Sequence, residues 1–467
     1  MAERMQKFVS LGQKWPEKRP ATERAADFHE IHREFIAEKA AEQAARCAQC
    51  GVPFCQTHCP LQNNIPDWLK LTAEGRLRDA YELSAATNPM PEVCGRICPQ
   101  DRLCEGGCVI EQSGHGAVTI GSVEKYLTDT AWREGWVAPL NARSERPESI
   151  GIIGAGPAGL AAAERLRTRG YQVTVYDRHD RIGGLLIYGI PNFKLEKDVI
   201  AKRAQRLIDG GVKFELNCDV GVSVSFGELR QRHDAVLIAA GVYKPRPLNA
   251  PSEMRIVAAL DYLIAANRVG LGDVVPAYES GELNAKDRRV VVIGGGDTAM
   301  DCVRTARRQG AKSVTCLYRR DRANMPGSQR EVAHAEEEGV GFDWLAAPKA
   351  VSKDAVRAAR MQLGAADASG RQAPEEKPNS AYDAPADLVI AALGFDAEDL
   401  SGWNVSTTRW GTVNADPLSY ATSQPGVFAA GDIVRGASLV VWALREGRDA
   451  ADGIHAWLQT QAKVAAQ

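Results

Sequence analysis

Two patterns of hydrophobic and polar positions divide the chain. In residues 1 to about 145, apolar side chains recur every three or four positions among charged ones, as in IPDWLKLTAEGRLRDAYELSAAT, which predicts amphipathic helices and little strand. After the polar linker at 142–149, short β-branched runs alternate with Ala-rich helical stretches, a pattern typical of parallel sheets. A helical part followed by α/β units is therefore predicted.

The α/β part contains one plan twice. Residues 149–184 and 289–321 each comprise a buried strand, a glycine turn, an Ala-rich helix, a glycine and a second strand. Two apolar strands at 234–247 and 386–395 end in a small residue and glycine, which suits chain crossings between two stacked sheets. We assign residues 350–385, rich in Ala, Ser, Gly and Pro, to a solvated hairpin or loop region.

Composition narrows the class of protein. The 467 residues are enough for about three domains, and 45% hydrophobic with 25% charged residues is ordinary globular composition. A net charge of -2 favours neither nucleic acid nor an anionic membrane surface as a partner. Because no signal region and no run of ~18 apolar residues is present, we expect a cytoplasmic protein.

Cysteine clustering predicts metal binding. Eight of the eleven cysteines lie between residues 47 and 108, and a reducing cytosol favours metal ligation over disulfides. Their spacing departs by two residues in one gap from the C-x2-C-x2-C-x3-C-P run of two-cluster ferredoxins, which predicts two 4Fe-4S clusters. Zinc is the alternative metal. Four-cysteine zinc sites are usually built from two C-x2-C pairs, however, and this sequence has only one among the eight cysteines. The candidate ligands are Cys47, Cys50, Cys55, Cys59, Cys94, Cys98, Cys104 and Cys108.

The first glycine turn predicts binding of a dinucleotide with an unphosphorylated ribose. Its glycines allow a tight turn and close approach of a pyrophosphate to the helix N-terminus. Asp177 ends the second strand, 23 residues after the first glycine, where a carboxylate binds ribose hydroxyls. The predicted contacts of the turn are Gly154, Gly156, Pro157, Ala158 and Gly159.

The second glycine turn predicts a different dinucleotide. Arg319 and Arg320 stand where the first unit has its acid, and a guanidinium can grip a 2′-phosphate. NADPH is therefore favoured here and FAD at the first turn, with hydride passing from nicotinamide to flavin. No side chain needs a catalytic role, because the cofactors carry the chemistry. The predicted contacts of the turn are Gly294, Gly296, Asp297, Thr298 and Ala299.

A strand, Gly431-Asp432 and a helix follow near the C-terminus. The aspartate is predicted to hold flavin ribityl hydroxyls, and the helix N-terminus to stabilise negative charge on the reduced flavin.

Together with GGLLIYGIPNFKLEK at 183–197 and LYRRDRANMPGSQREV, these motifs resemble the small (β) subunit of bacterial NADPH-dependent glutamate synthase over essentially the whole chain. The N-terminal half of dihydropyrimidine dehydrogenase is related. Gly184 and Leu185 join the expected FAD contacts.

The resemblance implies an α/β fold with an N-terminal α-helical iron-sulfur domain and two Rossmann-like domains for FAD and NADPH, the second inserted in the first. The expected boundaries are 1–145 for the iron-sulfur domain, 146–245 and 396–467 for the FAD domain, and 246–395 for the NADPH domain. It also implies that electrons from NADPH pass through FAD and the clusters to a large subunit. That partner carries FMN and glutaminase activity, and makes L-glutamate from L-glutamine and 2-oxoglutarate.

By analogy with dihydropyrimidine dehydrogenase, one cluster takes Cys47, Cys50, Cys55 and Cys108. The other takes Cys59, Cys98 and Cys104, with either Glu124 or Cys94 as the fourth ligand.

Two alternatives remain at this point. Instead of a glutamate synthase subunit, the chain could serve as a subunit of a ferredoxin:NADP transhydrogenase or similar electron-transfer module. The other alternative is a zinc-stabilised nucleotide-binding regulatory protein without redox chemistry.

Overall fold

The computed structural model describes residues 4–142, 144–367 and 372–465, so Arg143 of the predicted linker lies outside the described residues. The N-terminal part is helical, as predicted, and its apolar faces surround Trp68, a fully buried side chain. Its helices are α1 Ala21–Arg24, α2 Ala37–Ala44, α3 Phe54–His58, α4 Ile65–Ala73, α5 Leu77–Ala85, α6 Pro91–Ile97, α7 Val109–Gln112 and α8 Ile120–Arg133, with 3-10 turns at Lys7–Val9 and Gln100–Arg102.

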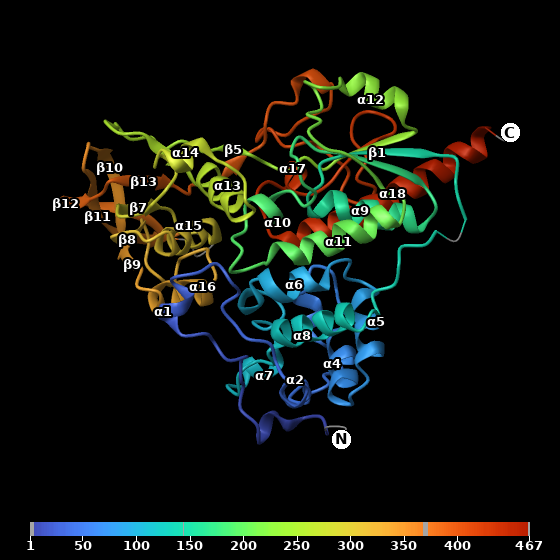
Figure 1. Ribbon diagram of the computed structural model, residues 1–467, viewed down its shortest axis with the longest axis horizontal. Helices are drawn as coiled ribbons and strands as arrows, with labels where there is room; N and C mark the ends of the chain where they lie inside the picture. Colours follow the sequence, from blue (N-terminus) through green and yellow to red (C-terminus); the bar gives the residue numbers. More distant parts are fainter. Residues whose placement is uncertain (1–3, 143, 368–371, 466–467) are drawn as a thin grey trace.

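The first α/β unit forms a five-stranded parallel sheet in the order β15-β4-β1-β2-β3. Its strands are β1 Ser149–Ile153, β2 Gln172–Tyr176, β3 Lys213–Glu215, β4 Ala235–Ile238 and β15 Val427–Ala429. Its helices are α9 Pro157–Thr168, α10 Leu185–Tyr188, α11 Lys197–Asp209, α12 Phe226–Arg232, α17 Asp432–Arg435 and α18 Val440–Ala465. The C-terminal helix α18 packs along α9 (Figure 1), and an added Cβ on Gly447 would overlap the carbonyl oxygen of Ala158.

The second unit forms another five-stranded parallel sheet, in the order β6-β13-β7-β8-β9. Its strands are β6 Ile256–Ala258, β7 Arg289–Ile293, β8 Ser313–Tyr318, β9 Gly341–Trp344 and β13 Leu388–Ala391. Its helices are α13 Ala259–Gly270, α14 Pro276–Glu279, α15 Asp297–Arg308 and α16 Gln329–Glu337.

The segment expected to be a solvated hairpin or loop is more regular than that. A three-stranded antiparallel sheet spans it, formed by β10 Ala346–Val351, β11 Ala355–Ala366 and β12 Gln372–Pro385. Val356 and Ala358 are fully buried, with a small apolar cluster beneath the sheet. Small alanines replace the β-branched residues that usually reveal a strand, which explains why the sequence pattern was weak.

The second unit is inserted in the first, as predicted. The chain leaves through β5 Lys244–Pro245 and returns through β14 Phe395–Asp396, and these two strands pair antiparallel. After a 3-10 turn at Ser401–Trp403, the chain adds β15 to the edge of the first sheet beside β4. Figure 1 shows the inserted unit beside the first sheet, with the helical N-terminal part below both.

Buried ion pairs join the helical part to the first α/β unit. Arg203 of α11 donates two hydrogen bonds, of 2.8 and 3.0 Å, to the carboxylate of Glu92 in α6, and both side chains are buried. Buried charges pair in few geometries, so this contact holds α11 against α6 in one orientation.

Candidate functional site

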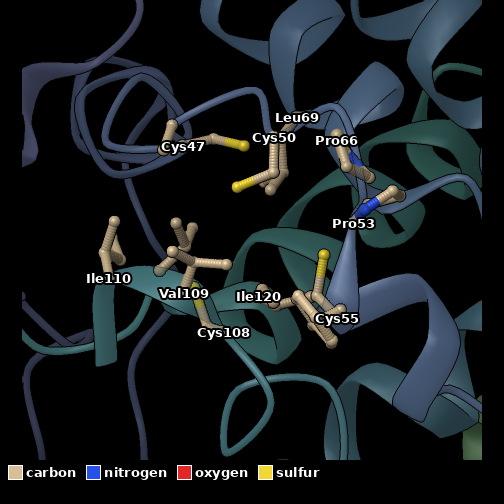
Figure 2. Close-up of a pocket in the computed structure, with 13 residues that line it drawn as sticks. Cys47, Cys50, Pro53, Cys55, Pro66, Leu69, Cys108, Val109, Ile110 and Ile120 are labelled. Carbon is tan, nitrogen blue, oxygen red and sulfur yellow. The ribbon is translucent and has the colours of Figure 1, made fainter. Parts of the chain in front are cut away.

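Four cysteines surround one apolar cavity in the helical part. Cys47 and Cys50 lie in the loop between α2 and α3, Cys55 lies in α3, and Cys108 directly precedes α7. Figure 2 shows these side chains around a common space, walled by apolar residues that include Leu69. Burial raises the pKa of the Cys55 thiol to about 12, so a thiolate there needs a bound cation.

This arrangement fits a cluster better than a single ion. Within the described parts of the chain, no three His, Cys, Asp or Glu side chains lie close enough to share one metal ion. Thiolates spread around an apolar space instead suit a multi-iron centre, whereas structural zinc requires four ligands about 2.3 Å from one point.

The second predicted cysteine set also comes together. Cys59 directly follows α3, Cys98 directly follows α6, and Cys104 comes after the next 3-10 turn. Both candidates for the fourth ligand lie beside them. The carboxylate of Glu124 in α8 interacts electrostatically with all three thiols, and Cys94 lies against Cys98.

The carboxyl group of Glu124 is buried but hydrogen-bonded. Its Oε1 accepts hydrogen bonds from Ser84 at 3.3 Å and Asn88 at 3.2 Å. Burial raises the pKa of Glu124 to about 8. Asn88 also contacts the other candidate, because its Oδ1 lies 3.7 Å from Sγ of Cys94.

Two glycines of the first turn, Gly154 and Gly159, have no room for a side chain. Gly154 has φ +109, and a Cβ there would overlap the carbonyl oxygen of Ala239. A Cβ on Gly159 would overlap the carbonyl oxygen of Gly154, so the start of α9 rests directly on the turn. This close approach leaves the backbone N–H groups of the helix N-terminus available to an anionic ligand.

Asp177 is fixed at the end of β2. Its carboxylate accepts hydrogen bonds from the backbone N–H groups of Ala155, at 2.7 Å, and His179, at 2.8 Å. Burial opposes its ionisation, but the hydrogen bonds from His179 and Ala155 outweigh it and hold the pKa of Asp177 below its usual value. A charged acceptor therefore stands beside the glycine turn, as ribose binding requires.

Two connected cavities run along this edge of the sheet. One of about 1100 Å³ and one of about 1070 Å³ share Gly154, Asp177, Ala240, Gly241 and Tyr243. Such an extended space suits a dinucleotide that crosses the carboxyl ends of the strands. The predicted residues that line it are Gly154, Gly156, Pro157, Ala158, Asp177, Leu185 and Asp432.

Three other predicted residues lie behind the cavity wall and allow its close packing. Gly159 supports the turn, and a Cβ on Gly184 would lie 2.8 Å from Cα of Gly156. Gly431 has φ +80, and a Cβ there would lie 2.9 Å from Cβ of Ala158. Burial raises the pKa of the neighbouring Asp432 to about 6.

The second glycine turn repeats the geometry. Gly294 has φ +148, and a Cβ there would overlap the carbonyl oxygen of Ala392. Gly296 precedes α15, whose first turn contains Asp297, Thr298 and the fully buried Ala299. The carboxylate of Asp297 accepts a hydrogen bond of 2.9 Å from the backbone of Ser328, so the turn is tied to the loop after β8.

Arg319 and Arg320 follow β8 at the same edge of the second sheet. Arg319 is exposed to solvent. Nε of Arg320 is buried and finds no hydrogen-bond partner among the described residues. A buried guanidinium nitrogen without a partner is able to donate to an anionic group, such as the predicted 2′-phosphate of NADPH.

A third cavity, of about 1750 Å³, brings the three predicted sites together. We call the 1070 Å³ cavity beside the first glycine turn, which Gly156 and Leu185 line, the first-sheet cavity. The third cavity shares Ile190, Thr298, Asp301 and residues 438–440 with it. It also reaches Cys98 of the second cysteine set. Cys98, the first-sheet cavity and the start of α15 therefore face one continuous space.

Sequence reasoning missed several residues of this space. Lys194 and Asp301 form a buried ion pair of 2.9 Å there, and residues 438–440 line two of its cavities. A faint signal existed for Asp301, since it lies one helical turn after Asp297 on the same face.

Comparison with known protein families supports the architecture. Residues 24–136 match the family described as dihydropyrimidine dehydrogenase domain II, 4Fe-4S cluster. Residues 148–447 match the family described as pyridine nucleotide-disulphide oxidoreductase.

Similar proteins span the whole chain. The glutamate synthase [NADPH] small chain of Azospirillum brasilense is 63% identical, over 99% of this chain and 98% of that protein. The protein of the same name from Escherichia coli is 44% identical, over 98% and 100%. AegA of Escherichia coli, named as an oxidoreductase, is 45% identical over 98% of this chain and 71% of its own length.

One solved structure shows the α/β fold. FprA of Mycobacterium tuberculosis in complex with NADPH superposes with a TM-score of 0.59 at 20% identity, covering 68% of this chain and 86% of FprA.

The fold and the site define an oxidoreductase of the pyridine nucleotide-disulphide class with an N-terminal iron-sulfur domain. The chain belongs to the family of glutamate synthase [NADPH] small chains. These matches confirm the predicted fold class, the resemblance, the NADPH-linked oxidoreductase activity and the cofactors FAD, NADPH and 4Fe-4S clusters. None of the helices in the described parts of the chain is long and apolar enough to cross a membrane.

We predict that Gly159→Ala abolishes FAD binding in the first-sheet cavity. The added Cβ overlaps the carbonyl oxygen of Gly154, so α9 must move away from the turn, at a cost of about 1–3 kcal/mol. The measurement is bound FAD per chain after purification. The matched control is Gly227→Ala in α12, where an added Cβ meets nothing within 4 Å. Equal FAD content in both variants would contradict the prediction.

Proposed function

We propose that this chain is the electron-input subunit of glutamate synthase. It oxidises NADPH and delivers electrons to a large subunit that carries FMN and glutaminase activity, and that makes L-glutamate from L-glutamine and 2-oxoglutarate. The observation that carries the proposal is the continuous space that joins Cys98 of the second cysteine set, the first-sheet cavity and the start of α15.

Each cofactor has a proposed set of contacts in this chain. FAD, when bound, takes two electrons from NADPH and releases them singly to the clusters, and the protein supplies position and electrostatics. The Gly154 turn binds its pyrophosphate, Asp177 its ribose and Asp432 its ribityl chain. The Gly294 turn binds the pyrophosphate of NADPH, and Arg319 and Arg320 its 2′-phosphate.

The domain boundaries belong to the same proposal. We propose an iron-sulfur domain at 1–145, an FAD domain at 146–245 and 396–467, and an NADPH domain at 246–395. The β5–β14 pair at the last two boundaries supports this division. We also propose that the complex works in the cytoplasm and needs neither nucleic acid nor a membrane.

The surface beside the first cysteine quartet is proposed to receive the large subunit. Val52 and Phe54 are 66% and 48% exposed although both are apolar, and Val109 lies next to Cys108 with 38% exposure. Phe54 and Val109 also line the cysteine cavity, and Cys50 and Cys55 are only partly buried, so the quartet lies close to this surface. Exposed apolar side chains around a redox centre suit a partner that accepts electrons there.

The proposal predicts that anaerobic purification from the native host recovers a large FMN-containing protein with this chain. NADPH oxidation by the complex should require both glutamine and 2-oxoglutarate. Val52→Asp should abolish recovery of the large subunit, because it places a charge in the contact, but leave NADPH oxidation with an artificial acceptor unchanged. Val274→Asp, at a position 76% exposed in the inserted unit, is the matched control.

A second candidate function is a ferredoxin:NADP transhydrogenase subunit or a related electron-transfer module. The observation that favours it is AegA, which resembles this chain over 71% of its length and is named as an oxidoreductase. Recovery of a small ferredoxin-like partner, with no amidotransferase, would replace the glutamate synthase proposal with this one.

Replacing Arg319 and Arg320 together by glutamine should weaken NADPH selectively. Charge-assisted hydrogen bonds contribute about 1.5–3 kcal/mol each, so the KM for NADPH should rise at least about tenfold while that for NADH changes little. Lys312→Gln, at the opposite end of β8, serves as the control. If the ratio of the KM for NADPH to the KM for NADH does not change, residues other than Arg319 and Arg320 determine the preference for NADPH.

We propose Glu124 as the fourth ligand of the second cluster, with Cys94 as the alternative. The interaction of Glu124 with all three remaining thiols supports it. Glu124→Ala should then bind fewer than the roughly eight iron atoms of two 4Fe-4S clusters, and Cys94→Ala should keep about eight. If Cys94→Ala loses iron and Glu124→Ala keeps about eight atoms, the fourth ligand is Cys94 instead.

A further inference from the structure

One short segment of the first α/β unit contacts all the other parts of the molecule. We call Asn192–Lys194 the anchor loop. It follows Ile190, which lines the cavity proposed for FAD. Nδ2 of Asn192 donates a hydrogen bond of 2.9 Å to the carbonyl oxygen of Phe28 in the N-terminal segment. The next two residues reach the inserted unit.

Phe193 inserts between the N-terminal segment and α15. Its ring is 1% exposed and lies under two guanidinium groups of α15, with Cζ of Arg304 4.5 Å and Cζ of Arg308 3.9 Å from the ring centre. Its ring centre also lies 6.3 Å from that of Phe28 in the N-terminal segment. Two cations over one desolvated ring hold the aromatic side chain in a fixed place.

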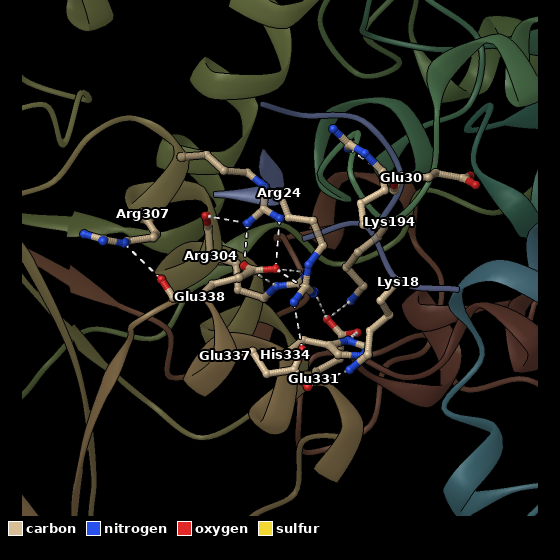
Figure 3. A network of polar contacts seen from close by, with 12 residues as sticks. Lys18, Arg24, Glu30, Lys194, Arg304, Arg307, Glu331, His334, Glu337 and Glu338 are labelled. Carbon is tan, nitrogen blue, oxygen red and sulfur yellow. Dashed lines mark hydrogen bonds and ion pairs between the residues drawn. The ribbon is translucent and has the colours of Figure 1, made fainter. Parts of the chain in front are cut away.

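Lys194 adds two ion pairs to the inserted unit. Its Nζ lies 2.9 Å from Oδ1 of Asp301 in α15 and 3.5 Å from Oε2 of Glu331 in α16. All three side chains are largely buried. Figure 3 shows Lys194 reaching into the network in which Glu331 also accepts a hydrogen bond of 2.7 Å from Arg304.

The ion pairs of Lys194 fix the orientation of α15 relative to the anchor loop more than they add to the strength of the contact. A buried ion pair gains little over a well-packed apolar contact, because desolvation of the two charges offsets their attraction. An apolar contact between α15 and the anchor loop would tolerate sliding, whereas one ammonium between two carboxylates fits in a single register. Helix α15 begins directly after the Gly294 turn, so its register also fixes the turn.

We propose that Lys194 is a positioning residue for NADPH oxidation: it locks α15, and with it the NADPH turn, against the cavity that holds FAD. The inference rests on the proposed function. Lys194 acts through Asp301 and Glu331 and sets the distance between the two dinucleotide sites. The strength of NADPH binding depends instead on the turn and on Arg319 and Arg320.

The test compares Lys194→Met with the wild-type full chain, both loaded with FAD and clusters. In anaerobic single-turnover mixing with saturating NADPH, the variant should reduce flavin about tenfold or more slowly, because small misplacements of reacting groups have effects of that size. The dissociation constant for NADP⁺, measured by calorimetry, should change less than about threefold. Amide hydrogen exchange in α15 should be faster in the variant.

Three further variants make the result specific. Lys194→Arg keeps the charge and should restore most of the rate. Arg268→Met removes another ion pair between the same two units, with Asp180 at 2.9 Å, and one inside the inserted unit, with Asp273 at 3.0 Å. Neither partner lies in α15, so this variant should stay near the wild-type rate. If Lys194→Met does not retain its cofactors, Lys194→Gln is measured in the same way.

The outcomes separate this inference from the proposed function. Wild-type rates in the uncharged variants would overturn the role of Lys194. A slow rate with an equally weakened NADP⁺ affinity would also overturn it, since Lys194 would then be a binding residue. A wild-type chain whose flavin is not reduced by NADPH would overturn the proposed function itself.

Discussion

One carboxylate joins the inserted unit to the N-terminal segment. Glu338 is buried and accepts hydrogen bonds from Arg304 and Arg308 of α15, at distances of 2.6 to 3.0 Å, and from Arg24 of the N-terminal segment at 3.4 Å. Although burial opposes its ionisation, Arg308 and Arg304 lower the pKa of Glu338 to about 2. Removing this charge would leave buried guanidinium groups without their partner. The resulting loss of folding free energy exceeds that from losing most apolar contacts.

The continuous cavity system depends on this contact and on those of the anchor loop. The inserted unit has a hydrophobic cluster of its own, whereas Met90, Val93 and Cys94 of the helical part belong to the same cluster as the core of the first α/β unit. The cavity shared by Cys98, Thr298 and residues 438–440 exists only while all three parts keep their relative positions. Electron transfer through one chain therefore relies on the interfaces between parts as much as on the sites within them.

The sequence predicted local features well. The helical part and the two βαβ units follow from short-range patterns, because spacing along the chain determines local geometry. The insertion of the second unit and the grouping of the cysteines into two sets were instead implied by the resemblance to a known family. The hairpin or loop expected at 350–385 is part of a three-stranded antiparallel sheet, whose alanines carry little strand signal. Arg24 and Glu338 are separated by 314 positions, so nothing in the local pattern could pair them. The same holds for Lys194 and Asp301, whose pairing depends on how two units pack.

The β5–β14 ribbon has a consequence for how the chain is made. Ribosomes deliver the chain from its N-terminus, and domains generally fold as they emerge. The inserted unit is complete before β15 leaves the ribosome, while the first sheet still lacks its edge strand and the turn at Gly431. The flavin cradle is thus the last part to close during biosynthesis, and a chain truncated after the inserted unit would carry a finished nucleotide domain beside an open one.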